Sequence, residues 1–140
     1  MATKMGFEGV LYYGAAGSTA ATQITNRRDV NYTIDNEKGD TTIAGAGSTP
    51  PIKTARVTAI VLSIEWTMLN RTDDTTLTAL RTAAAAGTAV AIRTKDYSSG
   101  KGFDGDVILS QKDGMPIAGE QTFVFTAEPT DENRTPQAYV

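Results

Sequence analysis

The chain has 140 residues, of which 13 are basic and 16 acidic, and it contains no histidine and no cysteine. This length predicts one domain, residues 1–140, with enough surface to bury a core without disulfide bonds. The composition excludes histidine bases, cysteine nucleophiles and the usual transition-metal ligands, so we expect no cofactor and no metal. A net charge of -3 does not favour tight binding to a phosphate backbone.

The N-terminal part predicts an arm followed by short extended segments. Residues 1–8 are expected to form the arm, and they lack the apolar core of a signal peptide. Apolar runs in the chain are all shorter than a membrane helix, so a soluble protein made in the cytoplasm is expected. A strand is predicted at residues 9–13, a glycine-rich loop at 14–19 and an extended piece at 22–25.

Residues 29–35 alternate between apolar and polar side chains, which predicts a strand with one solvated face. The next stretch, residues 37–54, contains three glycines and a Pro-Pro pair and predicts a long loop. Loops of this length are usually functional or disordered. Two interpretations stay open, a mobile surface loop or an arm that becomes ordered on a partner.

Residues 56–70, with Ala55 in front, form the longest apolar run and alternate with period two, which predicts a strand. Fifteen residues at about 3.3 Å each exceed the usual strand length, so a bend, a bulge or a wide curved sheet is expected. The bulky parity is predicted to face the core; it holds Ile60, Leu62, Ile64, Trp66 and Met68. The other parity becomes polar towards its end and is expected to face water, a neighbouring subunit or a channel.

A helix is predicted over about residues 73–86. Thr72 or Asp73 is expected to cap its start, and Gly87 is expected to end it. The apolar stripe of this helix is narrow, with Leu77, Leu80 and Ala84 at helical spacing. A stripe with two large residues predicts a helix on the flank of a sheet.

The last third of the chain predicts three further strands and a tail. The strands are expected at residues 89–95, 105–111 and 120–128, with polar turns at 97–102 and 112–116. In the last strand Phe123, Phe125 and Ala127 alternate with mostly polar side chains and are expected to face the core. Residues 129–140 have no periodicity and are expected to form a C-terminal tail.

Three patterns could be mistaken for chemical sites. Residues 100–105 match G-x-G-x-x-G, but a strand follows where pyrophosphate binding requires a helix, so a turn is favoured. Asp35, Glu37 and Asp40 do not have the spacing of a calcium loop. The carboxylates of Glu65, Glu120 and Glu128 could form a glycosidase pair, but they lie among Thr and Val, so a solvated or interface face is favoured. An enzyme is therefore disfavoured.

The order of these segments resembles the phage tail tube (major tail) proteins, related to the tubes of contractile injection systems. The resemblance begins with GVLYYG and DVNYTIDNEKGDTT, and continues through the long strand ARVTAIVLSIEWTMLN. It includes the helix DDTTLTALRTAAAAG before AVAIRTKD, and ends with DGMPIAGEQTFVFTAEPT. A shorter, more Gly/Thr-rich middle loop than in some relatives is a departure from the pattern.

The resemblance implies a mainly β fold, a β-sandwich or half-barrel protomer with one flanking helix. Six protomers are expected to form a ring whose strands join into a β-barrel, and rings are expected to stack into a tube. Implied partners are further copies of the chain, a tape-measure protein, a tail terminator and baseplate or tail-tip proteins. DNA is expected to pass through transiently without specific binding, no membrane is involved, and the implied location is the virion tail, assembled in the host cytoplasm.

Two surfaces follow as candidate sites. The loop between rings is expected to contain Asp40, Ile43, Gly45, Gly47, Pro50, Pro51, Ile52 and Lys53. The face towards the lumen or a neighbouring subunit is expected to contain Ser63, Glu65, Thr67, Glu120, Thr122 and Glu128. We also expect the edge strands of the protomer to pair between copies, because an open sheet edge must otherwise be protected.

Other function classes stay open. A carbohydrate-binding β-sandwich would need a row of exposed aromatic side chains, for which Tyr12, Tyr13 and Tyr97 are the candidates. Another virion structural protein is a further alternative.

Overall fold

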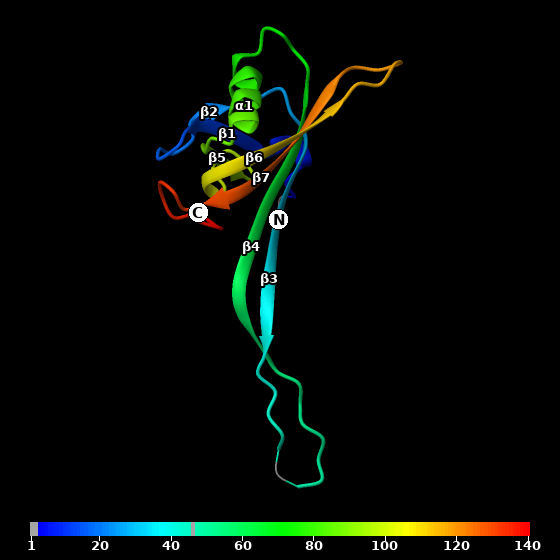
Figure 1. The fold of residues 1–140 in the computed structure, drawn as a ribbon, viewed down its shortest axis with the longest axis vertical. Coiled ribbons are helices and arrows are strands. Elements are labelled where there is room, and N and C mark those ends of the chain that lie inside the picture. The colour runs from blue at the N-terminus through cyan, green and yellow to red at the C-terminus, as the bar shows by residue number, and fades with distance from the viewer. Residues whose placement is uncertain (1–2, 46) are drawn as a thin grey trace.

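The computed structural model describes residues 3–45 and 47–140 of the chain. Residues 1 and 2 of the expected arm and residue 46 of the expected loop lie outside the described residues. Over the described residues the fold is mainly β, with a seven-stranded antiparallel sheet and one α-helix (Figure 1). In that part of the chain no helix is long and apolar enough to cross a membrane.

The strands are β1 (Val10–Ala15), β2 (Thr22–Gln23), β3 (Arg28–Asp40), β4 (Ala55–Leu69), β5 (Val90–Lys95), β6 (Asp104–Gly114) and β7 (Thr122–Thr130). A short 3-10 helix, η1 (Gly6–Glu8), precedes β1, and α1 (Thr75–Ala86) lies between β4 and β5. The order across the sheet is β2-β1-β5-β6-β7-β4-β3. The sheet curls around α1 as a half-barrel, so the prediction of a mainly β half-barrel with one flanking helix is confirmed (Figure 1).

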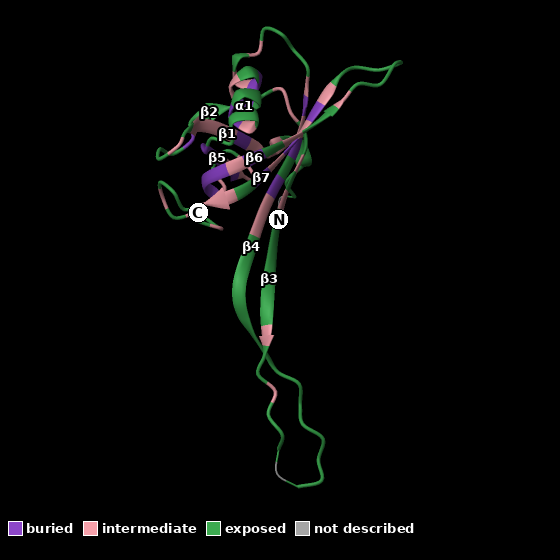
Figure 2. Ribbon diagram, in the orientation of Figure 1, coloured by how far each residue is buried: buried purple, intermediate pink, exposed green. Residues whose placement is uncertain are grey.

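The core lies between the concave face of the sheet and α1 (Figure 2). Trp66 of β4 and Phe125 of β7 are fully buried and stack with ring centroids 5.6 Å apart. Leu77 and Leu80 of α1 are buried against this layer. The predicted core parity is confirmed for Ile64, Trp66 and Met68 and for Phe123, Phe125 and Ala127, all of which are buried.

The start of the helix differs from the prediction by one or two residues. Asp74, rather than Thr72 or Asp73, is the N-cap, and its Oδ1 accepts hydrogen bonds from the backbone N–H of Thr76 and Leu77. Three adjacent polar residues can each cap a helix, so the sequence does not choose among them. Gly87 ends the helix in the left-handed conformation, φ +70°, as predicted.

The long strand is real, but the predicted core parity is wrong in its first half. Ile60 is 57% exposed and Leu62 is half-buried, although both share the parity of the buried Ile64. The reason is that the outer halves of β3 and β4 project as a hairpin past the rest of the sheet, whereas β7 pairs with β4 only from residue 64 onward (Figure 2). The expected irregularity is present as register shifts in the β3–β4 pairing.

Other boundaries differ as well: β1 continues to Ala15, inside the predicted glycine-rich loop, and β7 runs from Thr122 to Thr130, two residues into the predicted tail. Residues 37–40 belong to β3, where they pair with residues 55–59, so the loop spans residues 41–54. Lys112, Asp113 and Gly114 extend β6, because they pair with β7, and the turn follows them. Both β3 and β6 are longer than predicted, because backbone hydrogen bonds to the neighbouring strand continue through residues whose types are typical of turns.

Residues 131–140 lie against the sheet. The backbone groups of Gln137 and Asp104 exchange hydrogen bonds of 2.8 and 3.0 Å, and those of Val140 and Gly102 exchange bonds of 2.9 and 3.1 Å. Tyr32 of β3 donates a hydrogen bond from its hydroxyl to the carbonyl of Ala138, at 2.8 Å. The segment predicted as a tail therefore continues the sheet beyond the end of β7.

Candidate functional site

The most prominent surface is the hairpin of β3 and β4, which extends far beyond the body (Figure 1). Its strands carry exposed apolar side chains: Ile34 at 49%, Val57 at 50%, Ile60 at 57% and Val61 at 44%. Exposed apolar side chains grouped on one element are typical of a protein–protein contact. In the pairing of the strands, Ile34 lies opposite Leu62, so the apolar stripe of the core continues outward along the hairpin.

The loop at the end of this hairpin is closed by threonines. Thr41 and Thr54 are joined by a backbone hydrogen bond of 3.1 Å and by their hydroxyls at 2.8 Å. Asp40 accepts a 2.8 Å hydrogen bond from the N–H of Thr42, which lowers the pKa of that carboxyl. A carboxylate is favoured where a backbone N–H points at it, so Asp40 is charged at neutral pH.

The structure places the predicted inter-ring residues together at this end. Ile43 and Ile52 are more than 80% exposed. Gly45, Gly47, Pro50, Pro51 and Lys53 are also exposed, and Asp40 lies at the end of β3. The sequence therefore identified the residues of the loop, while the hairpin that carries them outward depends on the pairing of β3 with β4.

The predicted lumen or interface residues fall into two groups. Ser63, Glu65 and Thr67 of β4 have the parity opposite to the buried Ile64 and Trp66 and lie on the open face of the sheet, away from α1. Thr122 and Glu128 of β7 lie on the same face, which we call the open face. Glu120 does not join them, because it lies in the loop before β7, with its carboxylate 3.9 Å from Arg28.

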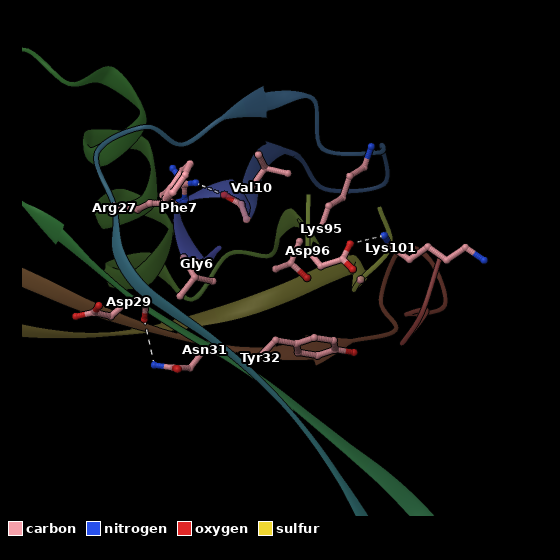
Figure 3. A pocket seen from close by; sticks show the side chains of 14 residues that line it. Gly6, Phe7, Val10, Arg27, Asp29, Asn31, Tyr32, Lys95, Asp96 and Lys101 are labelled. Atoms are coloured by element: carbon pink, nitrogen blue, oxygen red, sulfur yellow. Dashed lines mark hydrogen bonds between the residues drawn. The ribbon is translucent and has the colours of Figure 1, made fainter. Parts of the chain in front are cut away.

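A cleft of about 1010 Å³ lies between the N-terminal segment, the start of β3 and the end of β5 (Figure 3). Arg27 closes one side, donating hydrogen bonds to the carbonyls of Ile24 (3.0 Å) and Gly9. Tyr32 lines another side, and burial raises the pKa of its hydroxyl. With Asp96 accepting from the backbone N–H of Lys101, these groups stabilise the fold and form no nucleophile–base pair.

The sequence did not indicate this cleft, because its walls come from segments far apart along the chain. Among the described residues there is no group of three or more acidic side chains placed to hold a metal ion.

Three solved structures similar to this chain are chains of tails or virions. The chain is similar to a subunit in the tail of an empty gene transfer agent (GTA) particle, refined with C6 symmetry: TM-score 0.78, 14% identity, 97% of this chain and 98% of that chain covered. A chain in the native GTA virion gives TM-score 0.74 and 12% identity, with 99% of both chains covered. A chain of the SPP1 tail tube gives TM-score 0.66 and 9% identity over 90% of this chain and 75% of that chain. The chain has the tail-tube fold.

The resemblance seen in the sequence is thus confirmed at the level of the fold. No protein-family model matches the chain, and no curated protein sequence matches it. Because the identities lie between 9% and 14%, the shared property is the arrangement of strands and helix. The apolar periodicity of the strands and the positions of the turns can stay the same when individual residues are replaced, so chains with few identical residues can share this arrangement.

Two of the glycines in residues 100–105, Gly102 and Gly105, are explained by close packing. A Cβ at Gly102 would collide with the carbonyl and hydroxyl of Thr94. A Cβ at Gly105 would lie 2.9 Å from the ring of Phe103 and 3.0 Å from Pro136. These positions need glycine because other parts of the chain approach closely. Gly102 precedes β6 and Gly105 lies within it, so the segment leads into a strand, as expected for a turn rather than a pyrophosphate site.

Among the described residues, Tyr12, Tyr13 and Tyr97 do not form the row that a carbohydrate site needs. Tyr12 and Tyr13 are neighbours on β1 and point to opposite faces. Tyr13 packs on the core, whereas the Tyr12 ring lies 5.6 Å from the ammonium of Lys95. Tyr97 lies 4.4 Å from the ammonium of Lys4.

Proposed function

We propose that this protein is a structural subunit of a tail tube, in which rings of six copies stack into a hollow conduit for DNA. The observation that carries the proposal is the projecting β3–β4 hairpin in a chain with the tail-tube fold. Ile34, Ile60 and Val61 remain exposed on it, and burying such side chains against another copy is favourable by about 25 cal/mol per Å². The C6 symmetry of the similar GTA tail supports six copies.

The open face of the sheet is the surface that would line the lumen of the tube. The opposite face is covered by α1 and holds the core, so the open face is the one available to line a water-filled channel. It carries Ser63, Glu65, Thr67, Thr122 and Glu128, together with Arg28 and Lys112, which lie opposite Thr67 and Val124. The two acidic and two basic residues among them carry no net positive charge, and tight binding of a phosphate backbone depends on clustered cations. Pairing the sheet edges between copies would join the sheets of the six copies into one β-barrel whose inner wall is the open face of each sheet.

The role is structural rather than enzymatic, with the protein located in the virion tail after assembly in the host cytoplasm. Its further partners would be a tape-measure protein, a tail terminator and baseplate or tail-tip proteins. The loop of residues 41–54, with Ile43 and Ile52 exposed, would make the contact between rings.

The test is negative-stain electron microscopy of the purified protein at rising concentration, with light scattering on the same samples. Rings or hollow tubes of uniform diameter, with sixfold averages, are the expected result. A protein that stays monomeric at every concentration would contradict the proposal, and saturable binding of a sugar by that monomer would favour the binding-module alternative.

A further inference from the structure

The two ends of the long axis carry opposite charge. At one end is the distal hairpin, residues 38–56, where Lys38, Lys53 and Arg56 outnumber Asp40 and give a net charge of +2. Their side chains are all exposed. This part of the molecule is furthest from the body (Figure 1), so its charge is presented to whatever lies beyond that end.

The opposite end is formed by the loop before α1 and the tip of the β6–β7 hairpin (Figure 1). We call these residues, 70–74 and 112–121, the acidic end. They contain Arg71 and Lys112 against Asp73, Asp74, Asp113 and Glu120, a net charge of -2. Arg28 reaches Glu120 at 3.9 Å, but both side chains are more than half exposed, so this pair neutralises little.

The acidic end is one connected surface with apolar side chains of its own. Asn70 donates its backbone N–H to the carbonyl of Gln121 at 3.0 Å, and their side chains join at 2.6 Å. Beyond this link the tip projects with Met115 67% exposed and Ile117 fully exposed. Each end therefore combines exposed apolar side chains with charge, and the charges have opposite sign.

We infer that the acidic end is the surface on which the distal hairpin of a second copy docks. Complementary surfaces at opposite ends of one molecule make a head-to-tail contact, which repeats without closing and gives a filament. Opposite charge fixes the orientation of the partner, because two like ends repel. The inference rests on the proposed function and adds to it the acceptor for the hairpin: Met115 and Ile117, flanked by Asp113 and Glu120.

The test is a charge exchange between the two ends. The acceptor variant carries Asp113→Lys and Glu120→Lys, and the hairpin variant carries Lys53→Glu and Arg56→Glu; a third protein carries all four. Asp131→Lys with Glu132→Lys is the matched control, since both side chains are exposed and outside either end and the charge change equals that of the acceptor variant. Circular dichroism and thermal unfolding verify the fold of each protein.

Each two-residue variant is expected to raise the concentration at which tubes form at least ~10-fold, because a weak charge contact is repeated around every ring. The four-residue protein is expected to return close to the wild-type concentration, and the control is expected to match wild type. If the acceptor variant unfolds, Asp113→Asn with Glu120→Gln replaces it. This neutral variant is expected to raise the concentration at which tubes form by a smaller factor.

The inference would be overturned, while the proposed function stands, if wild-type tubes form and the reversal variants are unaffected, or if the four-residue protein forms tubes no better than the two-residue variants. A control that loses tubes as strongly as the acceptor variant would also overturn it, by showing an effect of net charge alone. Wild-type protein that forms neither rings nor tubes would overturn the proposed function, and the inference with it.

Discussion

At the scale of the residue, Arg134 joins the C-terminal segment to the sheet. Its Nε donates to Asp106 Oδ1 at 3.0 Å, and its Nη2 forms an ion pair with Asp104 Oδ1 at 3.1 Å. Asp106 is fully buried and also accepts from the N–H of Gly17 at 2.9 Å. Burial acts to lower the pKa of Arg134, but the bond to Asp106 and the charge of Asp104 outweigh it and raise the pKa.

Replacing this arginine is expected to cost much of the stability of the monomer. Arg134→Ala leaves two buried carboxylates without their cation, and removing one partner of a buried pair costs about 3 kcal/mol. The measurement is the free energy of unfolding in urea. Arg71→Ala is the control, because Arg71 is exposed, and it is expected to change stability by less than about 0.5 kcal/mol. A loss below about 1 kcal/mol for Arg134→Ala would contradict the assignment.

At the scale of the element, the start of α1 depends on which of three neighbouring polar residues caps it. Asp74→Ala removes the acceptor of the N–H groups of Thr76 and Leu77 and is expected to lower the free energy of unfolding by about 1 kcal/mol. Asp73→Ala is the matched control, since this exposed neighbour is not the cap. Equal losses for the two variants would show that the capping group is shared.

In the β3–β4 hairpin, the loop of residues 41–54 is expected to matter for assembly but not for the stability of the monomer. Deleting residues 45–50 shortens the loop of residues 41–54 and leaves the bonds between Thr41 and Thr54 in place. Loop closure depends weakly on length, so the free energy of unfolding is expected to stay the same while tubes no longer form in electron micrographs. Replacing the same residues by a Gly/Ser segment of equal length tests whether length or side chains matter; normal tubes from the deletion would refute the role of the loop.

At the scale of the whole molecule, the sheet has two unequal edges. One edge is β2, with two residues, and the other is β3, with 13 residues. Within the described chain β3 pairs with β4 alone. An exposed edge of that length invites pairing with another chain, which fits the expectation that edges pair between copies.

Amide hydrogen exchange of the monomer and of the assembled protein tests this edge. Peptides from β3 are expected to gain protection on assembly, because N–H groups that face water in the monomer become hydrogen-bonded between copies. Peptides from β5, which lies between β1 and β6, are the control and are expected to exchange equally in both states. Unchanged exchange in β3 would place the contacts between copies elsewhere.

The sequence by itself determined the local elements. Period-two alternation placed β4 and β7, and it identified Trp66 and Phe125 as core because a strand turns successive side chains to opposite faces. The end of α1 was equally local, since φ +70° at Gly87 is a conformation that favours glycine. The order of these elements was enough to indicate the tail-tube fold.

The tertiary structure decided how far the core extends and what the ends of the chain do. Ile60 and Ile64 have the same parity and similar chemistry, yet one is 57% exposed and the other buried, because burial depends on whether another strand lies alongside. The C-terminal segment has no periodicity, and distant partners hold it, Asp106 and Gly102 among them. The opposition of a basic and an acidic end likewise exists only after folding, since contacts between distant segments set the direction in which each loop points.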